Sequence, residues 1–197
     1  MRVLIACEFS GVVREAFRTH GHNAWSCDII PADDDSPYHL LTDVRGPIRW
    51  SWDLMIAFPP CTHLAVSGAH RFKYKQHEQA ESLKFVELLL DADIPRICLE
   101  NPVGIINTRI RKPDQIIQPY EFGEDASKKT CLWLKNLPKL IRTSYIEPGI
   151  SASGKRVWSN QTPSGQNKLG PSADRWKLRS KTYQGIANAM AEQWGGK

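Results

Sequence analysis

Short apolar runs along the chain alternate with stretches whose apolar residues recur every three or four positions. Five of the runs have the length and composition of buried strands, at residues 2–7, 24–30, 53–58, 94–99 and 130–134. The helical spacing predicts helices at residues 11–20, 76–91 and 183–194. Ser10 is in position to cap the first helix, and Gly21 to end it. Strands that alternate with helices predict an α/β fold with a mostly parallel sheet.

Residues 144–181 lack this patterning, because Gly, Ser, Pro, Asn and Gln dominate there. We expect an extended basic loop, and loops of this length in compact domains tend to be functional or disordered. Basic residues and two tryptophans are interspersed, which suits phosphates and unstacked bases. The alternative is a surface loop whose charges are only solvated. Our candidates for DNA contact in this loop are Lys155, Arg156 and Arg175.

The chain has 197 residues, which predicts one domain over residues 1–197, with residues 183–194 as its closing helix. An apolar share of 41% and a charged share of 24% exclude a disordered or fibrous chain. Apolar runs are too short to span a membrane, and the N-terminus does not resemble a secretory signal, so we expect a cytoplasmic protein. The net charge of +5 favours a polyanionic partner.

Five cysteines in odd number, spread along the chain without a CxxC motif, predict neither a disulfide framework nor a metal centre. Most lie in apolar runs, where buried free cysteine is common and inert. Cys61 differs because it follows Pro59 and Pro60 at the end of a predicted strand.

Ligands of open α/β sheets bind at the carboxyl ends of the strands. Gly11 follows the first predicted strand and would let a ligand approach the helix behind it, while Asp28 ends the second and suits the hydroxyls of a ribose. This pattern indicates a cofactor that contains a nucleoside. The alternative is that Gly11 only eases a turn and Asp28 only caps a neighbouring group.

Cys61 is a candidate nucleophile, because a thiolate on a strand-end loop can be reached, and His63 is a candidate base for it. The alternative is a lone cysteine without a chemical role. Glu100 follows the next predicted strand and therefore faces the same edge of the sheet. A cysteine and a carboxylic acid in one pocket indicate covalent attack on an electrophile whose basic nitrogen the acid engages.

Four blocks in this order resemble the signature blocks of the DNA cytosine-5 methyltransferase family, above all its short, phage-encoded members. They are Phe9-Ser10-Gly11, Pro59-Pro60-Cys61, Glu100-Asn101-Pro102 and Gln184-Gly185-Ile186-Ala187-Asn188-Ala189-Met190. The resemblance implies a Rossmann-like fold for S-adenosylmethionine-dependent methyl transfer, with helices on both faces of the sheet and no large target-recognition domain. A phage-encoded member would act in the cytoplasm of its bacterial host.

By this resemblance, Cys61 attacks C6 of a cytosine, Glu100 engages N3, and C5 takes the methyl group from S-adenosylmethionine. The resemblance also implies the cofactor-binding residues. The methionine part is assigned to Phe9, Ser10 and Gly11, the ribose to Asp28, the adenine to Asp43, and support of the pocket to Asn188.

The chain departs from the family pattern in several places. Val12 and Val13 stand where a further glycine or small residue is usual, and the block Gln-x-Arg-x-Arg has no clean match. Lys128 or Lys129 is the nearest candidate for its arginine and, with Pro60, is an implied contact to the substrate.

The implied substrate is cytosine in DNA, either flipped out of the duplex or already unpaired. Methylation of a free cytosine nucleotide is an alternative, to which a missing recognition domain is no handicap. A second alternative is a catalytically silent protein that binds nucleic acid or cofactor, against which the presence of both Cys61 and Glu100 argues.

Overall fold

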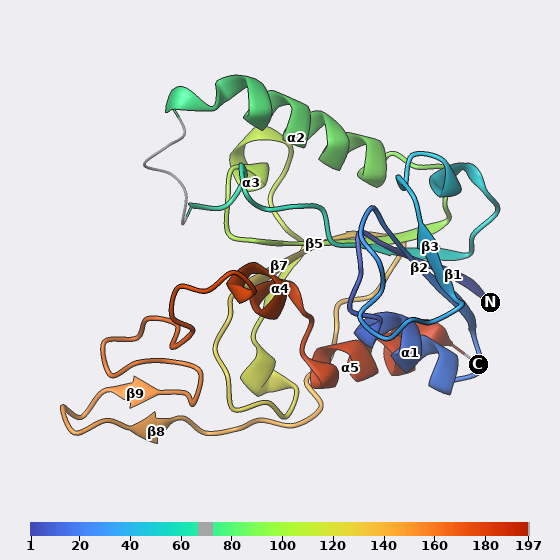
Figure 1. Cartoon of the computed structure of the whole chain (residues 1–197). Helices are drawn as coiled ribbons and strands as arrows, with labels where there is room; N and C mark the ends of the chain where they lie inside the picture. Colours follow the sequence, from blue (N-terminus) through green and yellow to red (C-terminus); the bar gives the residue numbers. More distant parts are fainter. Residues whose placement is uncertain (67–72, 197) are drawn as a thin grey trace.

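A sheet of seven strands runs through the centre of the computed structural model, which describes residues 1–66 and 73–196. The strands lie in the order β3-β2-β1-β4-β5-β7-β6 (Figure 1). Strands β1 to β5 are parallel, whereas β7 runs antiparallel to its neighbours β5 and β6. The bounds are β1 Arg2–Ala6, β2 Asn23–Asp28, β3 His39–Leu41, β4 Leu54–Ala57, β5 Arg96–Pro102, β6 Gln115–Ile117 and β7 Thr130–Lys135.

Helices cover both faces of this sheet (Figure 1). On one face lie α1 and α5, which contact each other, and on the other lie α2 and α3. A further short helix, α4, precedes α5 in the chain. The bounds are α1 Val12–Thr19, α2 Gln76–Leu90, α3 Ile106–Arg109, α4 Arg175–Ser180 and α5 Gln184–Gly195.

The central strands are buried on both faces, as expected of parallel strands between two helical layers. Val3 and Ile5 of β1 point into a core formed with α1 and α5, which contains Met190. Leu4, between them, points into the opposite core, which contains Leu89 of α2. The continuous apolar runs of the sequence follow from this double burial.

The predicted α/β fold, with a mostly parallel sheet and helices on both faces, is confirmed. Strand β1 pairs with both β2 and β4, so the order of the strands reverses at that point, where ligands of such sheets bind. Because Thr130 of β7 pairs with Pro102 at the end of β5, the residues just before β7 also reach this edge. The edge therefore collects the strand ends Glu8, Asp28 and Glu100 together with Lys128.

The structure contains several short elements that the apolar pattern does not predict. Strands β3 and β6 have three residues each, too few to show a period. Within residues 144–181, the short strands β8 Gly149–Ile150 and β9 Arg156–Val157 form a hairpin, and α4 follows (orange and red in Figure 1). None of the described helices is long and apolar enough to cross a membrane.

Helix α1 is capped by Glu8, and the prediction that Ser10 caps it was wrong. The residue before the helix is Gly11, and the Ser10 hydroxyl lies 3.5 Å from the Val12 nitrogen, at the limit of a hydrogen bond. The Glu8 carboxylate instead accepts the backbone N–H groups of Val13 at 2.8 Å and Arg14 at 3.2 Å. Glu8 is 4% exposed, and this burial raises the pKa of its carboxyl to about 7 against the opposing effect of the two N–H donors.

We expect Glu8→Gln to remove a pH dependence of stability. The folded-state pKa of Glu8 is raised from its ordinary value of 4.5 to about 7, so its contribution to stability is full below 4.5 and is lost as pH rises toward 7. The steepest loss is about 1.4 kcal/mol per pH unit. Denaturant unfolding of wild type and E8Q at several pH values measures it. A difference between the two proteins that stays constant across this range would contradict the prediction.

Candidate functional site

The turn that carries Cys61 is fixed by the neighbouring strand. It begins after β4, where the backbone N–H of Phe58 donates to the carbonyl of Ala6 at 2.9 Å. Asn101 of β5 is 1% exposed, and its side-chain amide donates to the carbonyl of Pro59 at 2.8 Å. Pro59 is buried, whereas Pro60 and Cys61 are exposed. Strand β5, which carries Glu100, therefore holds the loop that carries Cys61.

The chain just after Cys61 is also tied to the end of β5. The backbone N–H of Ile105 donates to the carbonyl of Leu64 at 2.9 Å, and Ala65 forms a β-bridge with Gly104. A Cβ atom at Gly104 would collide with the Leu64 carbonyl. Only glycine permits this approach, and a glycine beside an apolar run was the signal in the sequence that could have revealed it.

Glu100 lies at the end of β5 and is partly buried. Burial raises the pKa of its carboxyl, while the charge of Lys128 and a hydrogen bond to the Thr130 side chain act in the opposite direction. A small cavity beside this carboxyl is lined by Phe58, Lys128 and residues at the start of α5. Glu100 therefore holds a proton to higher pH than an ordinary carboxylic acid.

Cys61 and Glu100 are close enough for their charges to interact. Enclosure by the surrounding protein raises the pKa of the Cys61 thiol, and the charge of Glu100 raises it further. The cations Lys128 and Arg179 lower it. Lys128 is partly buried, and its ammonium donates to the carbonyl of Arg179 at 3.0 Å. The structure thus brings Lys128 to both groups of the pair.

Of the two lysines singled out in the sequence, Lys128 faces the pair, while Lys129 is exposed and its charge acts on Cys131. Arg179 is one of the basic residues within residues 144–181 but was not chosen as a candidate, because α4 lies in a segment without helical patterning. No hydrogen bond between described residues joins His63 to Cys61, and the buried Nδ1 of His63 has no partner among them. The hypothesis that His63 is the base of Cys61 gains no support from this geometry.

The turn between β1 and α1 is built on buried polar groups. Phe9 is buried, and its carbonyl accepts the backbone N–H of Asp33 at 2.9 Å. Gly11 has φ 72°, and a Cβ atom there would collide with the buried guanidinium of Arg14. That guanidinium donates to the Ser26 hydroxyl at 2.8 Å and forms an ion pair with Asp34. This position therefore requires glycine, because its φ is positive and because a side chain would collide with Arg14.

Asp28 and Asp43 both lie near the end of β1, since the charge of each raises the pKa of the Cys7 thiol there. Asp28 is partly buried, which raises its own pKa, and it accepts the N–H of Ile30 at 3.2 Å. Asp43 is exposed, and its carboxylate binds the backbone and side chain of Arg45 at 2.9 and 2.6 Å. Asn188 is exposed on α5 and accepts a hydrogen bond from Gln184, so no described contact joins it to this turn.

The donor set of this turn fits S-adenosylmethionine better than a phosphate-bearing cofactor. A helix N-terminus with free N–H groups binds phosphate, but here Glu8 takes the N–H groups of Val13 and Arg14. S-adenosylmethionine has no phosphate, and its positive sulfonium is attracted to a nearby carboxylate. Asp28, at the end of the adjacent strand, is available to the hydroxyls of a ribose.

The three basic residues proposed for DNA contact do not reach the pair of Cys61 and Glu100 in any described contact. Lys155 is exposed in the β8–β9 hairpin. Arg156 forms an ion pair with Glu147 at 3.0 Å, and Arg175 donates to the carbonyl of Leu169. Trp158 is stacked on Tyr120, with ring centroids 4.6 Å apart.

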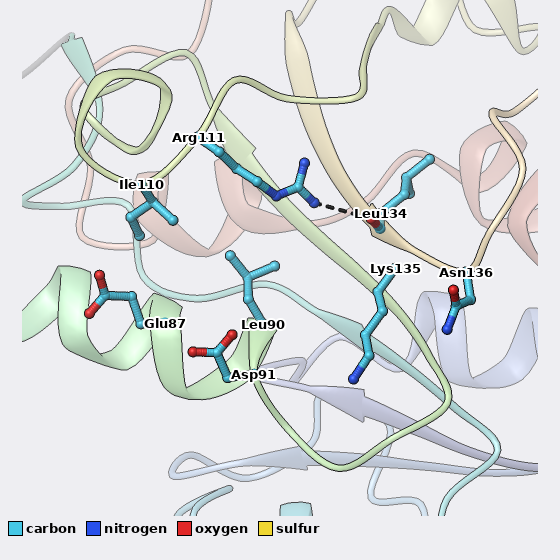
Figure 2. A pocket seen from close by; sticks show the side chains of 8 residues that line it. All are labelled: Glu87, Leu90, Asp91, Ile110, Arg111, Leu134, Lys135 and Asn136. Atoms are coloured by element: carbon cyan, nitrogen blue, oxygen red, sulfur yellow. Dashed lines mark hydrogen bonds between the residues drawn. The ribbon is translucent and has the colours of Figure 1, made fainter.

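A cavity of about 720 Å³ lies at the other edge of the sheet (Figure 2). It is lined by Leu90 and Asp91 at the end of α2 and by Lys135 and Asn136 at the end of β7. Lys135 pairs with Ile97 near the start of β5, so this cavity is at the amino ends of the parallel strands. The chemistry of such sheets lies at the opposite ends. No group of His, Cys, Asp and Glu within residues 1–66 and 73–196 is arranged to hold a metal ion.

No protein-family model and no curated protein matches the chain. Among solved structures, one described as a DNA modification methyltransferase encoded within a prophage (E. coli) is 14% identical with a TM-score of 0.49, covering 68% of this chain and 46% of that one. A mutant of Spodoptera frugiperda DNMT2 is 16% identical with a TM-score of 0.45, covering 74% and 54%. The chain therefore spans about half the length of these proteins. At this level of similarity, conclusions about the chemistry of the site have to be drawn from the residues of this chain.

Removing the charge of Lys128 should slow the alkylation of Cys61. Lys128 lowers the pKa of the thiol, so Lys128→Met raises it and reduces the thiolate fraction at a given pH. We expect the rate with iodoacetamide near pH 8 to fall roughly two- to tenfold, since one pKa unit changes that fraction tenfold. Cys61 is the exposed cysteine, so peptide mass spectrometry reads its labelling directly. Lys129→Met is the matched control, and equal rates in the two variants would refute the assignment.

Proposed function

We propose that the protein transfers a methyl group from S-adenosylmethionine to C5 of cytosine in DNA, through a covalent bond between Cys61 and C6 of the base. The observation that carries this proposal is the arrangement at the ends of β4 and β5. The loop that carries Cys61 is hydrogen-bonded to Asn101, the residue after Glu100, and Lys128 lines the cavity beside the Glu100 carboxyl. Burial raises the pKa of both Cys61 and Glu100, and the charge of Lys128 opposes both shifts.

The chemistry needs both groups, because C5 of cytosine is a poor nucleophile in the aromatic ring. Addition of the Cys61 thiolate to C6 pushes electrons toward N3, and a proton from Glu100 at N3 neutralises that charge. The ring then carries an enamine that is nucleophilic at C5. After methyl transfer, loss of the C5 proton and expulsion of the thiolate restore the aromatic ring, and N3 returns its proton to the Glu100 carboxylate.

The electrostatics of the pair suit this order of events. Burial favours the protonated form of Glu100, which is the form that can donate to N3. Protonation also removes the negative charge of Glu100, one of the two causes that raise the pKa of Cys61. Lys128 and Arg179 favour the thiolate. A proton on the acid therefore makes the nucleophile easier to form.

The cofactor supplies an electrophilic methyl group when bound. Its pocket would be formed by the turn at Phe9, Ser10 and Gly11 and by Asp28 and Asp43 at the ends of neighbouring strands. The cap on α1 by Glu8 supports a nucleoside ligand without phosphate, and the position of Asp28 at the end of β2 supports a contact to its ribose. Asn188 keeps only the support that the family resemblance lends it.

Cytosine in DNA must leave the base stack to reach Cys61, unless the strand is already unpaired. The net charge of +5 and the cations Lys128 and Arg179 at the site support a polyanionic substrate, and the exposed Lys129 is next to Lys128 in the chain. Pro60 is exposed next to the nucleophile and would contact the base from the same loop.

Transfer of tritiated methyl from S-adenosylmethionine tests the proposal. The wild type should label single-stranded or duplex DNA that contains cytosine, and nuclease digestion should recover the label in 5-methylcytosine. Cys61→Ser should label nothing while keeping the wild-type melting temperature, because the residue is exposed and the substitution replaces only sulfur by oxygen. Label in dCMP alone would favour the free nucleotide, label in RNA alone would contradict DNA as substrate, and no label in any substrate would favour a silent binding protein.

A further inference from the structure

Helix α4 presents an indole to the turn between β1 and α1. The ring of Trp176 lies 5.7 Å from the ring of Phe9, centroid to centroid, at an angle of 54°. Phe9 is buried, whereas Trp176 is 54% exposed. Part of the indole therefore contacts the turn between β1 and α1, and much of it is exposed, with the Lys177 ammonium 5.7 Å from the ring centroid.

A second contact ties the same segment to the same turn. Lys181, directly after the last residue of α4, forms an ion pair with Asp33 at 2.6 Å. The backbone N–H of Asp33 in turn donates to the carbonyl of Phe9. Trp176 near the start of α4 and Lys181 just after its end therefore contact Phe9 and Asp33, which are hydrogen-bonded to each other.

The other side of α4 faces the catalytic pair. The carbonyl of Arg179 accepts the ammonium of Lys128, and the charge of Arg179 acts on the Cys61 thiol. No residue of α4 is fully buried, so these few contacts, rather than packing in a core, hold the helix in place. A helix held in this way can respond to ligands on both of its sides.

We propose that Trp176 is a cofactor-binding residue and that α4 is a wall shared by the cofactor pocket and the nucleic-acid site, so that each ligand strengthens the binding of the other. This rests on the proposed function. A cofactor against the free part of the indole would order α4, and an ordered α4 presents Arg179 and Lys177 to a nucleic-acid strand. By linkage, nucleic acid must then raise cofactor affinity by the same factor.

If Trp176 only packs on Phe9 to hold residues 144–181 against the domain, the expected effects of its loss are different. An anchor needs only apolar contact, and its loss would weaken nucleic-acid binding without any dependence on cofactor. A shared wall predicts a loss of cofactor affinity and a loss of coupling together.

Calorimetric titration with S-adenosylhomocysteine, in the absence and presence of a single-stranded oligodeoxynucleotide containing cytosine, tests the proposal. For the wild type we expect the oligonucleotide to tighten binding about fivefold or more, the lower end of ordinary coupling. Trp176→Ala should weaken binding of S-adenosylhomocysteine alone about fivefold and bring the coupling factor close to one. Trp176→Phe, which keeps an aromatic ring, should retain most of both effects.

Trp50→Ala removes a similarly exposed indole, 50% exposed, and should change neither quantity. Wild-type binding of both ligands with no coupling would overturn the inference and leave the proposed function standing. The same holds if Trp176→Ala binds and couples like the wild type. If the wild type binds neither S-adenosylhomocysteine nor the oligonucleotide, the proposed function itself fails.

Discussion

The ammonium group of Lys128 lowers the pKa of both the Cys61 thiol and the Glu100 carboxyl, and the proposed chemistry depends on this shared cation. Burial raises the pKa of both groups, and the charge of Glu100 raises the pKa of Cys61 further, so Lys128 opposes the loss of the thiolate. The fold supplies Lys128 through the reversed strand β7, which begins where β5 ends. A sheet of parallel strands alone would not bring the residues before its last strand to this edge. The antiparallel strand therefore completes the site that β4 and β5 begin.

Contacts between β5 and the loop of Cys61 fix the position of Cys61 relative to Glu100. Asn101 follows Glu100 in β5 and donates to the carbonyl of Pro59 in the loop of Cys61, while Gly104 lets the chain after Cys61 approach β5. Cys61 and Glu100 are thus parts of one locally bonded unit rather than of two independent loops. The turn between β1 and α1 is stabilised differently, by the buried side chains of Glu8 and Arg14, and α4 extends from that turn to Lys128.

The sequence predicts the elements that long apolar runs define, and the ends of those strands indicate candidate site residues. Strands β1, β4 and β5 and helix α5 could be found because double burial leaves continuous apolar runs and a four-residue repeat. Cys61 and Glu100 follow from the rule that parallel strands end at one edge. Contacts made in three dimensions leave no such trace. The Glu8 cap was hidden because Ser10 occupies a usual capping position, and Arg179 because six residues of helix in a polar segment show no period.

The central claim is that Cys61 forms a covalent bond to C6 of cytosine, and trapping of that bond tests it most directly. In DNA that contains 5-fluorocytosine, the C5 substituent cannot leave as a proton, so the adduct should persist once the methyl group has been transferred. We predict a complex that resists denaturation, requires S-adenosylmethionine, and carries the nucleotide on the peptide that contains Cys61. Trapping at another residue, or equal trapping by Cys61→Ser, would contradict the account.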